Sequence, residues 1–145
     1  MTIEQISVFV ENAPGRLLEI METLGNAGID LRALSIGDTA RFGVLRLIVK
    51  DPQKAVTVLR AADYVISVTP VLAVSLEDTP GSLVKILRLL SDAAITVEYL
   101  YAFAARKKNS AYVVFRVEDN ALASAVLESG GVKVAGAAEI YDALS

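Results

Sequence analysis

Residues 11–20 read ENAPGRLLEI, and residues 77–86 read EDTPGSLVKI. In both stretches a Pro-Gly turn is followed by apolar residues at helical spacing. Sliding the chain against itself by 66 residues aligns 11–36 with 77–102, and nine of these 26 positions are identical: Glu11/Glu77, Pro14/Pro80, Gly15/Gly81, Leu17/Leu83, Ile20/Ile86, Leu24/Leu90, Ala27/Ala93, Ile29/Ile95 and Leu34/Leu100. The 145-residue chain is therefore a duplication of a module of about 70 residues.

The first copy predicts six elements. Apolar alternation before residue 11 is typical of a strand with one buried face, and the apolar stripe after the turn predicts a helix lying on a sheet. Strands follow at about 31–37 and 43–49. Asp51 and Pro52 then open a second helix as cap and first-turn proline, and a strand near 64–69 closes the copy.

The second copy predicts the same order, with strands at about 97–104 and 111–117, a helix capped by Asp119, and a last strand near 132–141. Strand, helix, strand, strand, helix, strand is the ferredoxin-like order. Right-handed crossovers place both helices on one face of a four-stranded antiparallel sheet. We predict an α+β protein of two tandem βαββαβ modules, with domains at 1–69 and 70–145.

The composition restricts the function classes. The chain has no cysteine and no histidine, so it has no disulfide, thiolate nucleophile or imidazole base. A zinc site is not expected, and we find no cluster of carboxylates, lysines, tyrosines or hydroxyls suited to catalysis. The net charge of −3 gives no positive field for a phosphate backbone. We expect no enzyme activity, no cofactor, no metal and no nucleic-acid partner, and Arg106–Lys108 is interpreted as a solvated hairpin tip.

The longest nearly apolar stretch, residues 93–105, carries Glu98 and is shorter than the roughly 20 residues that a membrane-spanning helix needs. The N-terminus lacks the basic and apolar regions of a secretory signal. We expect a cytoplasmic protein that does not enter a membrane.

Strand alternation assigns side chains to the two faces of each predicted sheet. Leu34, Leu45, Leu47 and Val49 are expected to face the helices. The opposite face carries Arg46, with Asp38 or a ligand carboxylate as its expected partner. In the second copy this face carries Tyr99, Tyr101, Phe103 and Tyr112, which favours packing at an interface over the alternative of a base-stacking RNA surface.

The Pro-Gly turn leads from a strand into a helix, where free backbone N–H groups and the positive helix end suit an anion. Glycine at positions 15 and 81 lets a ligand carboxylate approach the main chain. The alternative is that Pro-Gly only makes a turn.

Two motifs, Asn12-x-x-Gly15-x-Leu17 and Asp78-x-x-Gly81-x-Leu83, are each followed by a small-Ile-polar-aliphatic run, Gly28–Leu31 and Ala94–Val97. These residues resemble the ACT domain, a regulatory module that binds amino acids. The resemblance covers essentially the whole chain as two tandem copies, similar to small stand-alone tandem ACT proteins.

The resemblance implies an effector site at an interface between ACT modules, formed by the loop before the first helix and the second strand of a neighbouring module. The residues that it implies as ligand-binding are Asn12, Gly15, Arg16, Leu17, Asp30, Asp78, Gly81, Ser82, Leu83 and Thr96. ACT modules often have asparagine where this chain has Asp30 and Thr96, so the two sites are expected to differ, or only one to bind. Asp30 is equally well interpreted as a solvated residue before a strand.

The leading hypothesis is a regulatory sensor of an α-amino acid, acting as a homodimer and with an enzyme as a further partner. The second hypothesis is a ligand-free dimerisation or docking module that associates with a metabolic enzyme. An acylphosphatase-like enzyme is third, since the chain shows no glycine-rich phosphate loop paired with a catalytic asparagine.

Overall fold

The computed structural model describes residues 1–38, 41–105 and 109–142, so the expectation for Arg106–Lys108 lies outside the described residues. The chain divides into two compact units. We call Glu4–Thr69 the N-terminal unit, and Pro70–Ser145 together with Met1–Ile3 the C-terminal unit.

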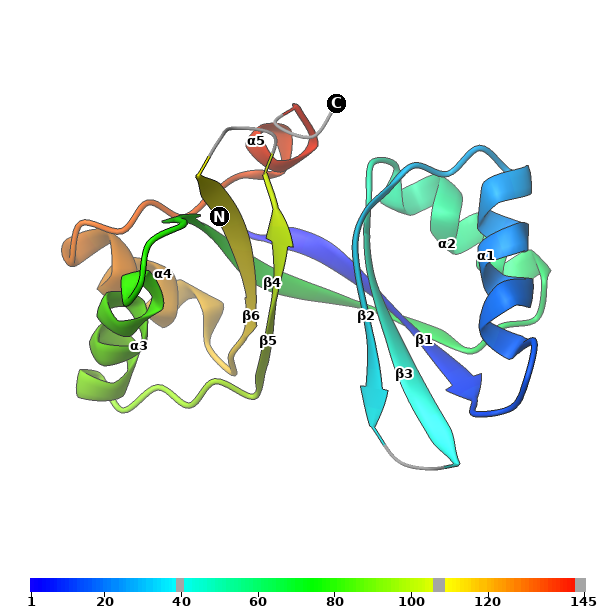
Figure 1. Ribbon diagram of the computed structural model, residues 1–145, viewed down its shortest axis with the longest axis horizontal. Coiled ribbons are helices and arrows are strands. Elements are labelled where there is room, and N and C mark those ends of the chain that lie inside the picture. The colour runs from blue at the N-terminus through cyan, green and yellow to red at the C-terminus, as the bar shows by residue number, and fades with distance from the viewer. Residues whose placement is uncertain (39–40, 106–108, 143–145) are drawn as a thin grey trace. The chain divides into compact units, whose positions relative to one another are not determined.

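The N-terminal unit contains β1 (Ile3–Glu11) except for its first residue, then α1 (Arg16–Asn26), β2 (Leu31–Asp38), β3 (Phe42–Val49), α2 (Pro52–Ala61) and the first residues of β4 (Ile66–Glu77). Its strands are ordered β2-β3-β1-β4, and β3 is antiparallel to both β2 and β1. Helices α1 and α2 lie side by side on one face of this sheet (Figure 1). This is the predicted ferredoxin-like arrangement.

The C-terminal unit contains the rest of β4, then α3 (Ser82–Asp92), β5 (Tyr99–Ala104), β6 (Ser110–Arg116), α4 (Asn120–Ser129) and α5 (Ala137–Asp142). Its strands are ordered β4-β6-β5, with β6 antiparallel to both neighbours. Helices α3 and α4 contact each other on one face of the strands (Figure 1). The predicted α+β class with ferredoxin-like units is confirmed.

The predicted last strand near 132–141 is wrong. Only Val134 forms a bridge, with Val74, and the Ala135 N–H donates to the Ala73 carbonyl at 2.8 Å. The chain then forms α5, because two alanines and a glutamate, all tolerated in helices, follow Gly136. Ile140, which was expected on a strand, lies on this helix, and its side chain is fully buried.

The core of each unit lies between its helices and strands. In the N-terminal unit it contains Leu45, Leu47 and Val49, as predicted. Leu34 pairs with Leu47 and so shares its face, but it is 51% exposed. The face assignment was correct, but β2 is the outer strand of its unit and its helix-side residues are not fully covered.

The second face of each set of strands also buries side chains. Ile48 and Val114 are fully buried, and the Tyr112 ring stacks on Phe103 at a centroid distance of 5.5 Å. Burial, with a smaller effect of the nearby Glu139 carboxylate, raises the pKa of Tyr112. The predicted partner of Arg46, the side chain of Asp38, lies outside the described part of the structure.

Helices α2 and α4 begin as the sequence predicts. The Asp51 carboxylate accepts from the Lys54 N–H at 3.1 Å, and the Asp119 carboxylate accepts from the Leu122 N–H at 3.0 Å. Each aspartate therefore satisfies one N–H group that the first helical turn leaves unpaired.

Candidate functional site

The loop between β1 and α1 has the backbone that the Pro-Gly turn predicts. Gly15 is the N-cap of α1 with φ of 84°, a left-handed conformation that favours glycine. No side chain caps this helix. The Arg16 N–H donates to the Ala13 carbonyl at 3.3 Å, so the amides of Leu17 and Leu18 are the ones that the first helical turn leaves for a ligand. The positive φ alone explains why glycine stands here, and a Cβ at Gly15 would meet nothing within 4 Å.

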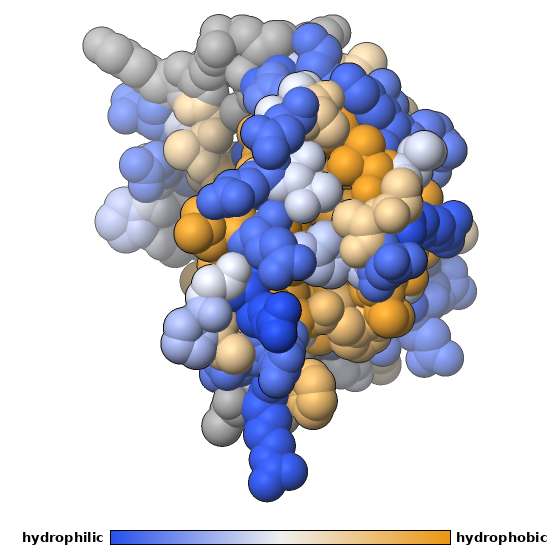
Figure 2. All heavy atoms as spheres, turned by 90° about the vertical axis from the view of Figure 1, so that its right-hand side faces the viewer, coloured by the Kyte–Doolittle hydropathy of each residue, from blue (hydrophilic) through white to orange (hydrophobic). Residues whose placement is uncertain are grey.

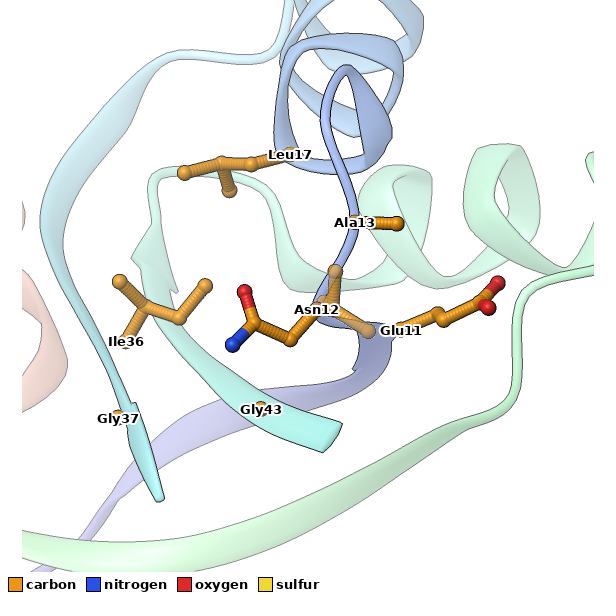
Figure 3. A pocket seen from close by; sticks show the side chains of 8 residues that line it. Glu11, Asn12, Ala13, Leu17, Ile36, Gly37 and Gly43 are labelled. Atoms are coloured by element: carbon orange, nitrogen blue, oxygen red, sulfur yellow. The ribbon is translucent and has the colours of Figure 1, made fainter. Parts of the chain in front are cut away.

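A hollow of about 420 Å³ lies beside this loop, within the size range of small-molecule sites. Figure 3 shows the Asn12 amide turned toward Ile36 and Gly37, whereas the Glu11 carboxylate points away. The hollow is lined by Val10, Glu11, Asn12, Ala13, Leu17, Ile36, Gly37 and Gly43.

Strand topology brings these residues together. Because β3 is antiparallel to both β1 and β2, the latter two run in the same direction, and the end of β2 lies at the same end of the sheet as the β1–α1 loop. Gly43 pairs with Val10, a member of the helix-side core, so a side chain at position 43 would point to the helix side. With glycine there, the floor of the hollow stays open.

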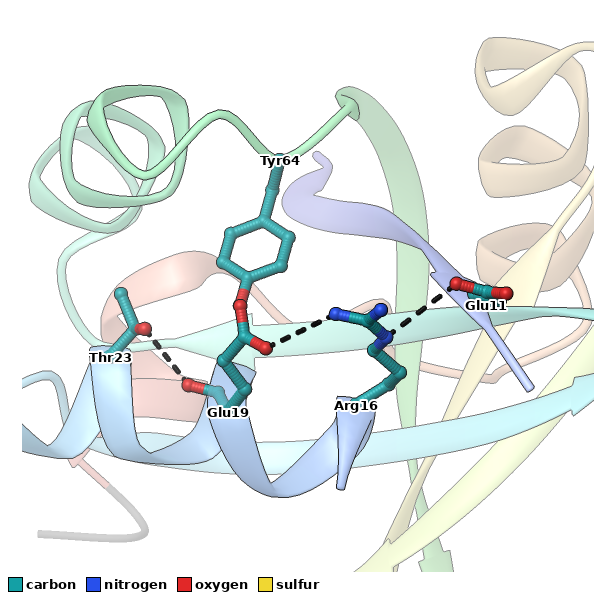
Figure 4. A network of polar contacts seen from close by, with 5 residues as sticks. All are labelled: Glu11, Arg16, Glu19, Thr23 and Tyr64. Atoms are coloured by element: carbon teal, nitrogen blue, oxygen red, sulfur yellow. Dashed lines mark hydrogen bonds and ion pairs between the residues drawn. The ribbon is translucent and has the colours of Figure 1, made fainter. Parts of the chain in front are cut away.

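Arg16 lies on the other side of the loop. Its guanidinium is placed between two carboxylates, 3.5 Å from Glu11 and 3.5 Å from Glu19 (Figure 4). Arg16 does not line the hollow beside Asn12, but a smaller hollow of about 240 Å³ with Phe9 and Tyr64. These ion pairs are exposed, so each contributes little to stability.

Tyr64 completes this polar cluster. Its hydroxyl donates to the Glu19 carboxylate at 2.8 Å, and the Thr23 hydroxyl donates to the Glu19 backbone carbonyl at 2.9 Å (Figure 4). Partial burial raises the pKa of Tyr64, and the hydrogen bond and negative charge of Glu19 raise it further.

Asp30 lies away from the hollow within the N-terminal unit. It immediately precedes β2, whose first residue pairs with Val49, at the end of the sheet opposite the β1–α1 loop. Its carboxylate pairs with Arg32 at 2.9 Å. The structure therefore brings Asn12 and Leu17 together at one hollow, with Gly15 and Arg16 in the same loop, and Asp30 elsewhere.

The equivalent loop of the C-terminal unit has the same backbone and different side-chain contacts. Gly81 also has φ of 84° and is the N-cap of α3. The hydroxyls of Thr79 and Ser82 are 2.6 Å apart, and the Asp78 N–H donates to the Asn109 carbonyl at 2.6 Å. Leu83 packs against the core of its unit.

Thr96 lies in the segment that leads into β5, three residues before the strand begins at Tyr99, and at the opposite end of the strands from the Asp78 loop. It lines a separate hollow of about 800 Å³. The other residues that line it are Ala94, Ile95, Glu98, Glu118, Asp119, Asn120 and Leu122.

Sequence reasoning missed part of the hollow, namely Ile36, Gly37 and Gly43 on its β2 and β3 side. The signal was present in the predicted topology: a right-handed crossover makes β1 and β2 parallel, so residues that end β2 belong near the loop. Glycines flanking the hairpin at 37 and 43 then mark the place where side chains leave space.

The structure has two tandem ferredoxin-like units, in each of which a helix without a side-chain cap follows a Pro-Gly turn. A model of the family described as ACT domain pair matches residues 1–134. The chain therefore belongs to the ACT domain pair family, and the resemblance inferred from the two motifs is confirmed.

Solved structures show the same fold. Protein BT0572 from Bacteroides thetaiotaomicron is 38% identical, with a TM-score of 0.90 over 97% of this chain and 96% of that one. The regulatory subunit of aspartate kinase from Thermus thermophilus, in a ligand-free form, is 17% identical, with a TM-score of 0.64 over 88% and 91%. Aspartate kinase from Synechocystis is 20% identical, with a TM-score of 0.57 over 94% of this chain and 28% of that one.

A comparison with curated protein sequences found no match. Among the described residues, no helix is long and apolar enough to cross a membrane. Within the same residues, no group of three or more carboxylates is arranged to hold a metal ion.

Proposed function

We propose that this protein is a non-catalytic sensor that binds an α-amino acid at the β1–α1 loop of an ACT unit. The hollow beside Asn12 is the observation that carries the proposal, because it joins a ligand-sized space to a polar side chain and an uncapped helix start. The amide N–H groups of the first turn of α1 suit a carboxylate. The Asn12 side chain offers both a donor and an acceptor, so its NH₂ group suits the ligand carboxylate and its oxygen suits the ammonium group.

Binding regulates only if the ligand has different affinities for two states of the protein. The β1–α1 loop is suited to such coupling because its other side carries the Glu11–Arg16–Glu19 ion pairs, which are exposed and weak. A ligand that moves Glu11 would rearrange these pairs at small energetic cost. We propose that the readout is the affinity of a homodimer for a partner enzyme, and that the protein acts in the cytoplasm.

A thermal-shift screen of the full chain against the twenty amino acids tests this function. A ligand at about 100 times its dissociation constant adds roughly 2.7 kcal/mol to the free energy of unfolding. For a chain of this size we expect the melting temperature to rise by about 5 to 10 °C. The absence of any shift, with every amino acid at 10 mM, would contradict the proposal.

The second candidate is a ligand-free docking module. It is favoured by apolar side chains at the surface, of which Phe42 and Val65 are 61% and 67% exposed. Figure 2 shows hydrophobic side chains that reach the surface between polar ones on the face at the right of Figure 1. Sizing with light scattering, with and without amino acids, separates the candidates: a docking module gives a ligand-independent mass and no thermal shift.

A further inference from the structure

We propose that the ligand is an amino acid with an aliphatic side chain, and that only the N-terminal unit binds it. This inference rests on the proposed function and adds the chemical class of the ligand and the copy that holds it. It is carried by the lining of the hollow beside Asn12 and by the residues at the same positions of the other copy.

The walls of the hollow are mostly apolar. Val10, Leu17 and Ile36 contribute aliphatic side chains, and Ile36 is 45% exposed, so part of its surface remains open to a ligand. Glu11 is the charged residue among those lining the hollow, and its carboxylate points away, toward Arg16 (Figure 3, Figure 4). A ligand side chain in this place loses water to aliphatic groups, which favours an aliphatic side chain over a polar or charged one.

The open floor at Gly43 makes room for that side chain. A Cβ at Gly43 would lie in ordinary contact with Ile36, 3.5 Å from its Cγ1 and 3.7 Å from its Cδ1. Any larger side chain at position 43 would extend beyond this contact into the hollow. The space that a ligand would fill therefore exists because the residue at position 43 is glycine and has no side chain to occupy it.

The C-terminal unit has different residues at the equivalent positions. Strand register makes Ala111 the counterpart of Gly43, since Ala111 pairs with Leu76 as Gly43 pairs with Val10. Ala102, which pairs with Val113 as Ile36 pairs with Leu45, is the counterpart of Ile36. The floor thus gains a methyl group, and the wall loses most of an aliphatic side chain.

The polar side chain also changes. The repeat places Asp78 where the N-terminal unit has Asn12. A carboxylate at this position repels the carboxylate of an amino acid, whereas an amide can donate to it. The Thr79 hydroxyl, which contacts that of Ser82, adds a polar group where the first loop has Ala13, and Ser82 replaces the guanidinium of Arg16 with a hydroxyl.

Calorimetric titration of the full chain tests the ligand class. Each additional buried methylene group strengthens binding about fourfold, so L-leucine, L-isoleucine or L-valine should bind at least tenfold more tightly than L-alanine, with one ligand per chain. L-aspartate, L-lysine or L-serine binding as tightly as the best aliphatic amino acid, or two ligands per chain, would overturn the inference and leave the proposed function standing. If none of the amino acids binds, the proposed function and this inference both fail.

Matched variants test the location. Gly43→Leu fills the hollow and should weaken binding of the best aliphatic amino acid at least tenfold, while Ala111→Leu at the same position of the other copy should change it less than twofold. The reverse pattern would overturn the assignment to the N-terminal unit. If Gly43→Leu does not fold, Ile36→Asn on the exposed outer strand replaces it, and the same tenfold loss is required.

A third pair of variants tests the effect of a negative charge in the β1–α1 loop. Asn12→Asp gives the first loop the carboxylate of the second and should weaken binding at least tenfold. Asn26→Asp makes the same chemical change at the far end of α1 and should leave the affinity unchanged. Equal affinities of the two variants would contradict a role for the Asn12 amide in holding the ligand carboxylate.

Discussion

At the residue scale, Gly15 is required by the conformation of the backbone and not by a lack of space around it. Its φ of 84° is unfavourable for any residue with a Cβ, although the space around it is empty. Gly25, near the end of α1, also has open space but no positive φ. A comparison of alanine substitutions at these two glycines therefore measures the cost of backbone strain alone, because an added Cβ makes no steric contact at either position.

We predict that Gly15→Ala lowers the free energy of unfolding by about 1 to 2 kcal/mol, because alanine is strained in the left-handed region. Gly25→Ala should raise the free energy of unfolding by about 0.5 to 1 kcal/mol, because alanine is the better helix former. Urea denaturation of both variants measures the difference. Stabilisation by Gly15→Ala would show that this turn does not have a positive φ.

The hydroxyl of Tyr64 gives a prediction that depends on pH. Below the unfolded pKa of tyrosine, near 10, the Tyr64 hydroxyl keeps its proton in both the folded and the unfolded protein. Because the folded pKa of Tyr64 is raised, the unfolded chain releases its proton first as the pH increases. The stability from this group is therefore complete below about pH 10 and is lost as the pH rises further toward the folded pKa.

We expect Tyr64→Phe to cost about 0.5 to 1 kcal/mol at pH 7 through the lost hydrogen bond to Glu19. Above pH 10 the difference from the unsubstituted protein should become smaller. Thermal unfolding at pH 7, 9 and 10.5 provides the measurement. A difference that grows with pH would contradict the raised pKa.

At the element scale, helix starts were predictable and the end of the second copy was not. Asp51 and Asp119 precede helices at equivalent positions, and both act as caps. The strand expected at 132–141 was inferred from apolar residues and from the symmetry of the repeat. In the structure Val134 makes one bridge, and Ile140 lies on α5 with its side chain buried. An apolar residue that becomes buried can thus belong to a strand or to a helix, and its apolar character alone does not distinguish the two.

We predict that Asp51→Ala and Asp119→Ala each lower the free energy of unfolding by about 1 kcal/mol, since each removes a capping hydrogen bond. The caps belong to separate helices with no shared partner, so the double variant should lose about 2 kcal/mol. Asp51→Asn and Asp119→Asn serve as controls that retain a cap. A double variant that loses no more than one single variant would show that the two caps are coupled.

The candidate site was predictable only in the part that a local sequence motif describes. The motif identified Asn12 and Leu17, which line the hollow. Its other side comes from Ile36, Gly37 and Gly43, which become neighbours of the loop only through strand pairing. A sequence motif marks local geometry, whereas a hollow depends on register between strands that are distant in sequence.

At the scale of the whole molecule, two copies with one fold carry different chemistry. The repeat conserves the core positions and the Pro-Gly turns, which fix the backbone of each unit. It changes Asn12 to Asp78, Ile36 to Ala102 and Gly43 to Ala111, which alters the surface beside each turn. These differences are the basis of our proposal that one copy holds a ligand and the other does not.

The most direct test is an NMR titration of the full, ¹⁵N-labelled chain with the amino acid that gives the largest thermal shift. We predict that the largest amide shift changes fall at residues 12–18 and 36–37, around the hollow of the N-terminal unit. Changes that fall mainly at residues 78–84, or no change at saturating concentration, would contradict the claim that this hollow is the effector site.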